Sequence, residues 1–391
     1  MRIFVLHNYY QDKGGEDIVF AQEVEELKRD HHVRTMTFVN KKGSHGLLQF
    51  LLYPWNIFAT RKAIRQITEF RPDIVHVHNV HYAIGPLLFR ALYKRKIPIV
   101  ITLHNFRLLD PSASLFYKGH AYMPHLKADF PWESVRRKVL NNSLLKTFWT
   151  AFTYYLHKKI GTWHYVDKYL TFSNFAKQCL TDSSLQIKSD RIAIKPNFAK
   201  PLLINEIITS RLAYFVYIGR LSEEKGISTL LKAFSRTDKT LKIFGDGPLR
   251  DEVLQYAHRY PNIQYEGFQD KAILNKHLLA CQALVVPSIC YEGMPLSILE
   301  AFSVGTPVLA SKLGILEEMI QERVHGLHFE ANDPESTRAT LDKWQRLSEE
   351  DKQKISANCH KAYLDKYSPR KNVILLESIY QETIQNRKNN E

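Results

Sequence analysis

Two glutamates eight residues apart, Glu292 and Glu300, have the types and spacing that most directly suggest chemistry in this chain. Pro295 lies between them and favours a first helical turn, and Leu296 and Phe302 mark one face of the helix that follows. A helix N-terminus favours an anion, whereas carboxylates accept hydrogen bonds from hydroxyl groups. The pattern therefore predicts a ligand with both phosphate and hydroxyl groups, as in a nucleotide sugar.

A second group of candidate residues is Gly219, Arg220 and Lys225. The glycine ends an apolar run, where a backbone can approach a ligand closely, and the two cations precede the next helical pattern. When a nucleoside diphosphate departs, negative charge concentrates on its phosphate oxygens, and preorganised cations stabilise that charge. We therefore interpret Arg220 and Lys225 as diphosphate ligands that assist the leaving group.

The elements that must position these residues form a regular alternation in the second half of the chain. A strand at Tyr214–Ile218 is followed by a helix at Ile227–Phe234 and a strand at Leu241–Phe244. Strands at Leu284–Pro287 and Thr306–Ala310 flank the helix between the two glutamates. This alternation predicts a parallel, doubly wound sheet.

The first half repeats the same alternation with different strand-end residues. Four strands are expected, at Arg2–His7, Val33–Phe38, Asp73–Val77 and Ile97–Thr102. Ligands of such sheets gather beyond the carboxyl ends of the strands. Those ends carry Gly14–Gly15, His78–Asn79 and His104–Asn105.

The run from Glu292 to Glu300, E-G-M-P-L-S-I-L-E, resembles the E-x7-E signature of retaining glycosyltransferases of the GT-B fold, in particular family 4. The similarity continues through Gly305, Thr306, Pro307 and Val308. The resemblance implies an α/β protein with two Rossmann-like, doubly wound domains that face a central cleft. Residues 1–200 would form the acceptor domain and residues 201–367 the donor domain, with a helix at 368–391 that returns to the first domain.

The same resemblance implies roles for individual residues. Glu292 would contact the hydroxyls of the donor sugar, Glu300 the ribose, and His104 would lie beside the transferred sugar. Gly14 and Gly15 would form the loop under the diphosphate. Further donor-binding residues would be Gly219, Gly293, Met294, Pro295 and Leu296, where the backbone N–H groups of Met294 and Leu296 face the phosphates; proline has no N–H to offer.

The implied activity is that of a retaining, metal-independent, hexosyltransferase-type enzyme of bacterial surface polysaccharide (exopolysaccharide) synthesis. The donor would be a nucleoside-diphosphate sugar, with UDP favoured over GDP, and the acceptor a lipid-diphosphate-linked sugar or another saccharide. No cofactor and no metal are expected, because the sequence contains no Asp-x-Asp. His76 and His78 share a strand face, but no third metal ligand stands at a diagnostic spacing, so buried, hydrogen-bonded histidines are favoured.

Two other functions are compatible with parts of this sequence. A GT-B epimerase would convert a UDP-sugar without any acceptor. A basic nucleic-acid-binding protein would bind in a salt-dependent way without turnover, but no motif that reads RNA or DNA supports it. The sequence departs from the family pattern at Phe198 and Ile315, which leaves the hinge geometry and the donor preference open.

The charge of the chain is concentrated in its first half. Residues 1–200 hold 30 Lys+Arg and 15 Asp+Glu, a balance of +15, whereas residues 201–391 hold 24 and 25. A basic half indicates anionic partners, here the anionic inner surface of a membrane and a phosphorylated substrate. No apolar run is long enough to span a membrane, and the N-terminus lacks the pattern of a signal peptide. The expected location is the cytoplasm, peripheral on the inner face of the plasma membrane, and the oligomeric state stays open.

Residues 132–166 have a composition of their own. No acidic residue occurs from Ser134 to Val166, while an apolar and aromatic stripe recurs at helical spacing among basic residues. Such a helix can lie in a membrane interface, through Trp149 and Phe152 for example. It can equally be a core helix with a basic outer face, and the sequence leaves the two interpretations even.

Overall fold

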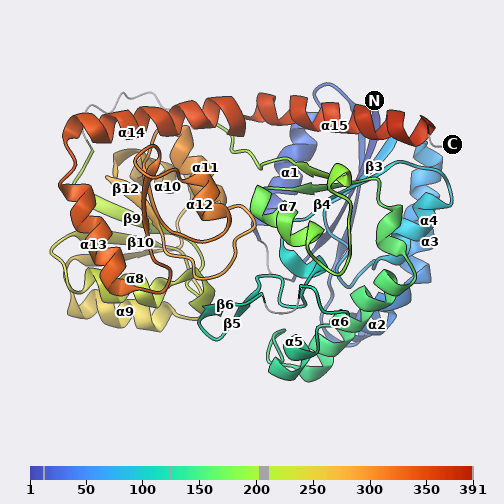
Figure 1. The fold of residues 1–391 in the computed structure, drawn as a ribbon, viewed down its shortest axis with the longest axis horizontal. Helices are drawn as coiled ribbons and strands as arrows, with labels where there is room; N and C mark the ends of the chain where they lie inside the picture. The colour runs from blue at the N-terminus through green and yellow to red at the C-terminus, as the bar shows by residue number, and fades with distance from the viewer. Residues whose placement is uncertain (12–13, 124–125, 202–210, 390–391) are drawn as a thin grey trace. The chain divides into compact units, whose positions relative to one another are not determined.

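The computed structural model describes residues 1–11, 14–123, 126–201 and 211–389. The chain forms two compact units (Figure 1). The N-terminal unit comprises Met1–Ser114, Met123–Pro196 and Asn372–Glu391, and the C-terminal unit comprises Leu115–Tyr122 and Asn197–Lys371. The sequence-based division placed residues 115–122 within the first domain, whereas the structure groups this short hairpin with the second.

The N-terminal unit contains a six-stranded parallel sheet in the order β2-β1-β3-β4-β7-β8. Its strands are β1 (Arg2–Tyr9), β2 (His32–Val39), β3 (Ile74–Val77), β4 (Ile99–Thr102), β7 (Lys168–Thr171) and β8 (Ile192–Ile194). Its helices are α1 (Gly15–Leu27), α2 (Gly43–Leu52), α3 (Ile57–Phe70), α4 (Leu87–Tyr93), α5 (Trp132–Arg137), α6 (Leu144–Lys159), α7 (Asn174–Thr181) and most of α15 (Pro369–Asn389), with the short 3-10 helix η1 (Tyr53–Trp55) after α2.

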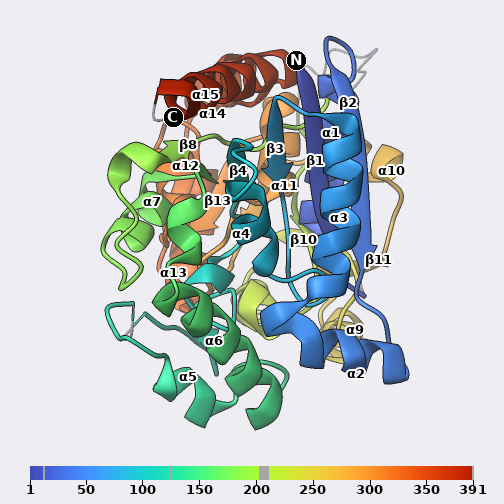
Figure 2. The ribbon, with the colours of Figure 1, turned by 90° about the vertical axis from the view of Figure 1, so that its right-hand side faces the viewer.

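Alternate residues of β1 supply two separate cores on the two faces of this sheet. Phe4 and Leu6 pack in one cluster with residues of α3 and α4, two helices that lie against each other (Figure 2). Ile3 and Val5 pack in the other cluster with residues of α1 and α15. Because side chains of a strand alternate between faces, a strand buried on both sides reads as a continuous apolar run, which is what residues 3–6 show.

The C-terminal unit repeats the plan with the strand order β11-β10-β9-β12-β13-β14. Its strands are β9 (Tyr214–Ile218), β10 (Thr240–Phe244), β11 (Ile263–Gly267), β12 (Ala283–Val286), β13 (Val308–Ser311) and β14 (Gly326–Phe329), with the hairpin β5 (Phe116–Tyr117) and β6 (His120–Ala121). Its helices are α8 (Ile227–Phe234), α9 (Arg250–Arg259), α10 (Lys271–Ala280), α11 (Leu296–Ser303), α12 (Ile315–Met319), α13 (Pro334–Gln345) and α14 (Glu349–Ala362).

Both units therefore have the predicted Rossmann-like, doubly wound architecture. In each six-stranded sheet the described strand pairs are parallel, and the chain passes through at least one helix or helical turn between neighbouring strands. Among the described helices, none is long and apolar enough to cross a membrane.

Candidate active site

The candidate site of the C-terminal unit lies where the strand order reverses. Strand β9 pairs with β10 on one side and with β12 on the other, so the carboxyl ends of β9 and β12 flank the switch point of the sheet. In sheets of this order, ligands bind outside these ends. Gly219 and Arg220 directly follow β9, and the loop that carries Glu292 follows β12. The topology thus brings both sequence-predicted groups to one place.

Lys225 and Glu292 are in direct contact at this switch point. The ammonium of Lys225 donates to both carboxylate oxygens of Glu292, at 2.6 and 2.8 Å, and Ser288 donates its hydroxyl to Oε1 at 2.6 Å. Desolvation alone would lower the pKa of Lys225, but the negative groups around it, chiefly Glu292, together raise it. The structure thus holds a charged lysine and an oriented carboxylate side by side.

The backbone at Gly226 explains how Lys225 comes so close to β12. Gly226 has a φ of +69°, and a Cβ atom at this position would lie 1.9 Å from the carbonyl oxygen of Pro287. Only glycine permits both the left-handed conformation and this contact. The amide of Ile289 also donates to the carbonyl of Glu224 at 3.0 Å, which joins the two loops a second time.

Arg220 occupies a different environment from Lys225. Its side chain is exposed, and within the described part of the chain the structure gives it no ion pair. Its backbone is fixed, because the Tyr217 hydroxyl donates to the Arg220 carbonyl at 2.7 Å. The glycine pair Gly219 and Gly245 packs closely, since a Cβ atom on Gly245 (φ +138°) would lie 1.9 Å from the Gly219 carbonyl. Arg220 therefore projects from a rigid strand end.

Helix α11 begins at Leu296, and Pro295 is its N-cap residue with an extended backbone (φ −65°, ψ 119°). The prediction that Pro295 starts the first helical turn was thus wrong by one residue. No side chain caps this helix among the described residues. The half-buried N-terminus of α11, preceded by Gly293 and the buried Met294, therefore keeps N–H groups for an anion.

Glu300 lies one turn into α11 and is half-buried. Its carboxylate forms an ion pair with Lys271 of α10, with 3.1 Å between Oε1 and Nζ. No contact joins Glu300 to Lys225 or Glu292 within the described residues. Glu292 thus lies in the loop before α11 and Glu300 within the helix, apart from each other. Two residues that bind different parts of one extended molecule would be separated in this way.

In the N-terminal unit, the residues after β1, β3 and β4 converge on Glu16. Asn79 donates to Oε1 of Glu16 at 2.7 Å and Asn105 to Oε2 at 3.4 Å. Burial is the main cause that raises the pKa of Glu16 to about 7. Gly14 is the N-cap of α1 and Gly15 its first residue, so the predicted glycine loop stands directly before this carboxyl group.

His104 is the first member of a buried chain of hydrogen bonds. Its Nε2 lies 3.0 Å from Nδ1 of His78, whose own Nε2 lies 3.0 Å from Glu23 Oε1. Lys195 forms an ion pair with the other oxygen of Glu23. Burial is the main cause of the lowered pKa of His104, and it is also the main reason why the pKa of His78 falls to about 3. Both imidazoles are therefore neutral at pH 7. This chain of hydrogen bonds fixes the orientation of His104.

Two groups of described residues have the geometry to hold a cation: Glu23 with His76 and His78, and His7 with Glu16 and Asp17. In the first group the ammonium of Lys195 already lies on the Glu23 carboxylate. A metal ion would therefore face a fixed positive charge in a buried space, which is unfavourable. Sequence spacing alone gives no third ligand for His76 and His78, because Glu23 lies about fifty residues earlier in the chain.

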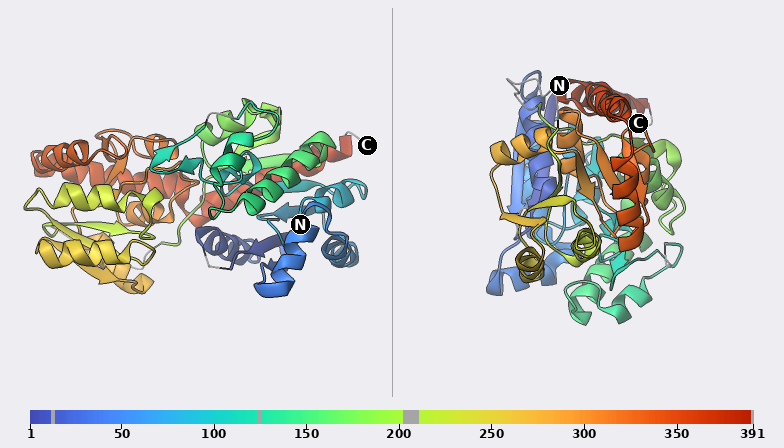
Figure 3. Two further views of the ribbon diagram at one scale, coloured as in Figure 1. Left: turned by 90° about the horizontal axis from the view of Figure 1, so that it is seen from below. Right: turned by 90° about the vertical axis from the view of Figure 1, so that its left-hand side faces the viewer.

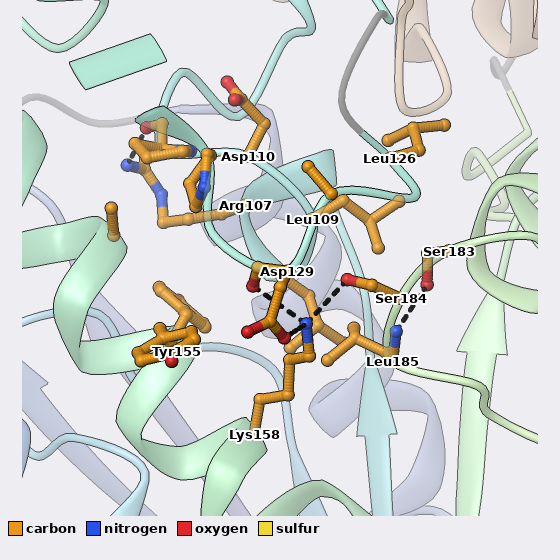
Figure 4. Close-up of a pocket in the computed structure, with 16 residues that line it drawn as sticks. Arg107, Leu109, Asp110, Leu126, Asp129, Tyr155, Lys158, Ser183, Ser184 and Leu185 are labelled. Atoms are coloured by element: carbon orange, nitrogen blue, oxygen red, sulfur yellow. Dashed lines mark hydrogen bonds and ion pairs between the residues drawn. The ribbon is translucent and has the colours of Figure 1, made fainter. Parts of the chain in front are cut away.

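A small pocket elsewhere in the N-terminal unit is too small for a sugar (Figure 4). Its free volume is about 40 Å³, close to that of a single water molecule in the liquid. Lys158 crosses it and donates to the Asp129 carboxylate and to the Ser184 hydroxyl, both at 2.9 Å. The bonds from Lys159 and Lys158 lower the pKa of Asp129 to about 2. The bonds that cross this pocket join α6 to the loops beside it, so we interpret the pocket as part of the packing of the unit.

Two family models match the chain and between them cover most of its length. The model of glycosyltransferase family 4 matches residues 2–200, and the model described as glycosyl transferases group 1 matches residues 205–362. The chain belongs to glycosyltransferase family 4.

Individual relatives of this family 4 chain are distant. It is 25% identical over 218 residues to the uncharacterized glycosyltransferase MJ1178 of Methanocaldococcus jannaschii, covering 55% of this chain and 60% of that protein. It is 28% identical over 191 residues to the O-antigen chain mannosyltransferase B of Escherichia coli, covering 45% and 49%. The chain thus spans less than two thirds of the length of either relative.

A solved structure extends the similarity to the whole chain. The Anabaena protein Alr3699/HepE in complex with UDP aligns with a TM-score of 0.69 and 16% identity, over 97% of this chain and 100% of that one. At this identity the likeness establishes the fold and no more. The predicted GT-B fold of the family 4 chain is confirmed.

Sequence reasoning missed several polar residues of the family 4 chain that the structure places around His104. Glu16 follows Gly14–Gly15 directly, and its position beside a glycine pair at a helix start was a signal that could have been used. Glu23 and Lys195 offered no such signal. Each lies in an ordinary helix or loop pattern, and only the sheet topology brings them together.

Proposed function

We propose that this chain is a retaining, metal-independent glycosyltransferase that uses a nucleoside-diphosphate sugar. UDP is favoured over GDP as the nucleotide, and the acceptor is a lipid-diphosphate-linked sugar or another saccharide of bacterial surface polysaccharide synthesis. The enzyme works at the anionic inner face of the membrane. The UDP complex of Alr3699/HepE and the O-antigen role of the E. coli relative support these choices by similarity.

The observation that carries the proposal is the contact of Lys225 with Glu292, which also accepts from Ser288, beside the uncapped N-terminus of α11. Lys225, Arg220 and the free N–H groups suit a diphosphate, and the Glu292 carboxylate suits the hydroxyls of a sugar. When donor binds, its diphosphate competes with Glu292 for the Lys225 ammonium. Glu292 is then available to accept hydrogen bonds from the sugar.

The reaction that this arrangement supports is displacement on one face of the sugar. The bond between the anomeric carbon and the phosphate oxygen breaks, and the electron pair stays on the diphosphate, where Lys225 and Arg220 stabilise it. The acceptor oxygen bonds to the same face of the anomeric carbon, and its proton passes to a phosphate oxygen. The anomeric configuration is therefore retained.

The direct test is a screen of UDP- and GDP-sugars for thermal stabilisation, followed by NMR of the product formed with a saccharide acceptor. We expect a UDP-sugar to stabilise the protein and the product to keep the anomeric configuration of the donor. Inversion of that configuration would contradict the proposed mechanism. Conversion of the donor in the absence of acceptor would instead establish the epimerase.

Replacement of Glu300 should mainly weaken binding of the nucleotide. If Glu300 holds a ribose hydroxyl, Glu300→Ala removes a hydrogen bond to a charged group and raises the Kd of free UDP about 10- to 100-fold. Calorimetry measures this directly. Glu317→Ala is the control, because Glu317 also pairs with a lysine but lies outside the site. An unchanged Kd in folded Glu300→Ala protein would remove Glu300 from the site.

Removal of divalent metals should leave turnover unchanged, because Arg220 and Lys225 take the part that a metal plays in other transferases. The measurement is the initial rate after treatment with EDTA, with and without added Mg²⁺ or Mn²⁺. Loss of activity that Mn²⁺ restores would overturn the metal-free assignment. The two groups of carboxylate and histidine side chains described above, around Glu23 and around Glu16, would then be the first metal sites to examine.

A further inference from the structure

Helix α2 of the N-terminal unit carries a row of exposed leucines. None of its ten residues is buried. Leu47, Leu48 and Leu51 are exposed to 57%, 55% and 54%, and Phe58, at the start of α3, to 71%. Leu51 is four residues from Leu47 and three from Leu48, the spacings at which side chains are neighbours on a helix, so the three leucines form one apolar face. A cluster of this kind on a folded unit marks an interaction surface.

The opposite side of α2 is fixed to the rest of the unit. The Gln49 side chain donates to the Val39 carbonyl at 3.1 Å, and Trp149 of α6 donates its indole N–H to the Phe50 carbonyl at 2.6 Å. The rings of Phe50 and Tyr82 also meet edge to face, with their centroids 5.6 Å apart. The three leucines therefore point outward, because the opposite face of α2 is packed against the rest of the unit. This outward face, with Trp55, Ile57 and Phe58, is called the α2 surface below.

The charge around the α2 surface has one sign. The sequence holds no acidic residue from His31 to Thr68. Six cations of this stretch are exposed: Arg34, Lys41, Lys42, Arg61, Lys62 and Arg65. An exposed apolar face with a border of cations matches the boundary between the headgroups and acyl chains of an anionic bilayer.

The α2 surface lies at the same end of the sheet as the Glu16 and His104 cluster. Helix α2 follows the carboxyl end of β2, and η1 joins it to the strand ends through the Tyr53 hydroxyl, 2.9 Å from His81 Nδ1. The His81 carbonyl in turn accepts from Asn8 of β1 at 2.7 Å. Figures 2 and 3 show α2 and α6 together at this end of the unit.

We infer that the α2 surface inserts into an anionic lipid bilayer and holds the N-terminal unit on the membrane. The inference rests on the proposed function only for the presence of a lipid-linked acceptor. It also changes the part assigned to residues 132–166. Trp149 and Phe152 are half-buried, and Trp149 is bonded to α2, so the aromatic stripe of α6 is a support for the inserting helix. Leu144 and Leu145, at the start of α6, are also exposed.

The test is co-sedimentation of the full chain with vesicles of phosphatidylcholine alone and with 30 mol% phosphatidylglycerol added. We expect binding only to the anionic vesicles. The variant Leu47→Gln/Leu48→Gln/Leu51→Gln should bind them at least about ten-fold more weakly, because the apolar insertion is lost while the cations remain. Since all three leucines are exposed, the variant should fold normally. The control is Leu254→Gln/Phe268→Gln/Leu364→Gln, three exposed apolar residues of the C-terminal unit, which should bind as the wild type does.

A second measurement separates insertion from surface attraction. Trp55 is partly exposed on the α2 surface, so brominated acyl chains should quench its emission in anionic vesicles. Comparison with Trp55→Phe isolates its signal from the other tryptophans. Equal vesicle binding by the leucine variant, or binding to neutral vesicles as strong as to anionic ones, would overturn the inference.

The alternative partner for the α2 surface is a second copy of the chain. Sedimentation without lipid decides this, because a dimer that the leucine variant abolishes would replace the membrane inference. Failure of the proposed function would look different. If UDP no longer stabilised the wild-type protein while vesicle binding persisted, the activity would be wrong and the surface assignment would stand.

Discussion

Lys225→Ala is expected to lower kcat by about 10²- to 10³-fold with a much smaller change in the KM of the donor. The reason is that Lys225 stabilises charge that develops on the diphosphate only as the bond to the sugar breaks. A single preorganised hydrogen-bond-donating group that stabilises such charge has an effect of this size on kcat. Initial rates over a range of donor concentrations provide the measurement. Lys242→Ala is the control, since Lys242 pairs with Glu266 on the same sheet, away from the switch point.

The same experiment on Arg220 tests whether the two cations share the task. Arg220 has no ion pair among the described residues, so Arg220→Ala leaves no stranded partner and should not affect stability. Lys225→Ala leaves Glu292 without its cation, and thermal unfolding of that variant must accompany the kinetics. A higher KM with unchanged kcat in both variants would assign them to ground-state binding of the donor, against the leaving-group role.

The C-terminal site was predictable because its residues are close in sequence to strong local signals. Glycines 219 and 226, a proline at 295 and two glutamates mark the ends of strands and the start of a helix, and a doubly wound sheet brings such ends together. Strand and helix boundaries differed from the prediction by a few residues at most. Those differences arise at element ends, where local pattern is weakest.

The site of the N-terminal unit was less accessible to sequence reasoning. The glycine pair and the histidines after β3 and β4 could be named, since they follow strands directly. The partners of those histidines could not. Glu23 lies on the third turn of α1 and Lys195 just after β8, and neither position departs from an ordinary helix or loop pattern. Their meeting depends on the packing of elements that are 172 residues apart.

Residues 132–166 show a different limit. The composition of this segment indicated either a membrane helix or a core helix, and α6 has features of both. Its buried face is made of small and polar residues, among them Thr147, Thr150 and Ala151, while its aromatic residues are half-buried. Sequence periodicity gives the apolar stripe but not the element that covers it. In the structure, Phe50 of α2 lies against Trp149, and Phe130 and Trp132 lie against Phe148.

Lys195→Met should lower the free energy of unfolding by about 3–5 kcal/mol at pH 7–8, the largest stability effect expected in this chain. Lys195 and Glu23 form an ion pair in which both side chains are 1% exposed. Removal of one partner leaves a buried, uncompensated charge, which costs far more than loss of an exposed pair. Urea unfolding, followed by hydrogen exchange of peptides from β1 and β3, reports the N-terminal unit separately. Lys168→Met is the control, because its partner Glu382 is half-exposed and can be solvated.

The double variant Glu23→Gln/Lys195→Met should recover most of this loss, since it removes both charges and keeps a polar group beside His78.

The loss of stability in Lys195→Met should also depend on pH. In the wild type, desolvation would raise the pKa of Glu23, but Lys195 and the two histidines hold it well below its usual value. The stability that the carboxylate contributes is therefore present above about pH 4 and is lost only as the pH falls through that lowered value.

Without Lys195, burial should raise the pKa of Glu23 above its value in the unfolded chain. The folded variant then binds a proton that the folded wild type does not, so the variant gains stability relative to the wild type as the pH falls. We expect the difference in unfolding free energy to shrink between pH 8 and pH 5. A difference that stays constant over this range would mean that lost packing of the lysine stem, and not a stranded Glu23 charge, destabilises the variant. The Glu23–Lys195 pair would then lose its place as the anchor that orients His78 and His104.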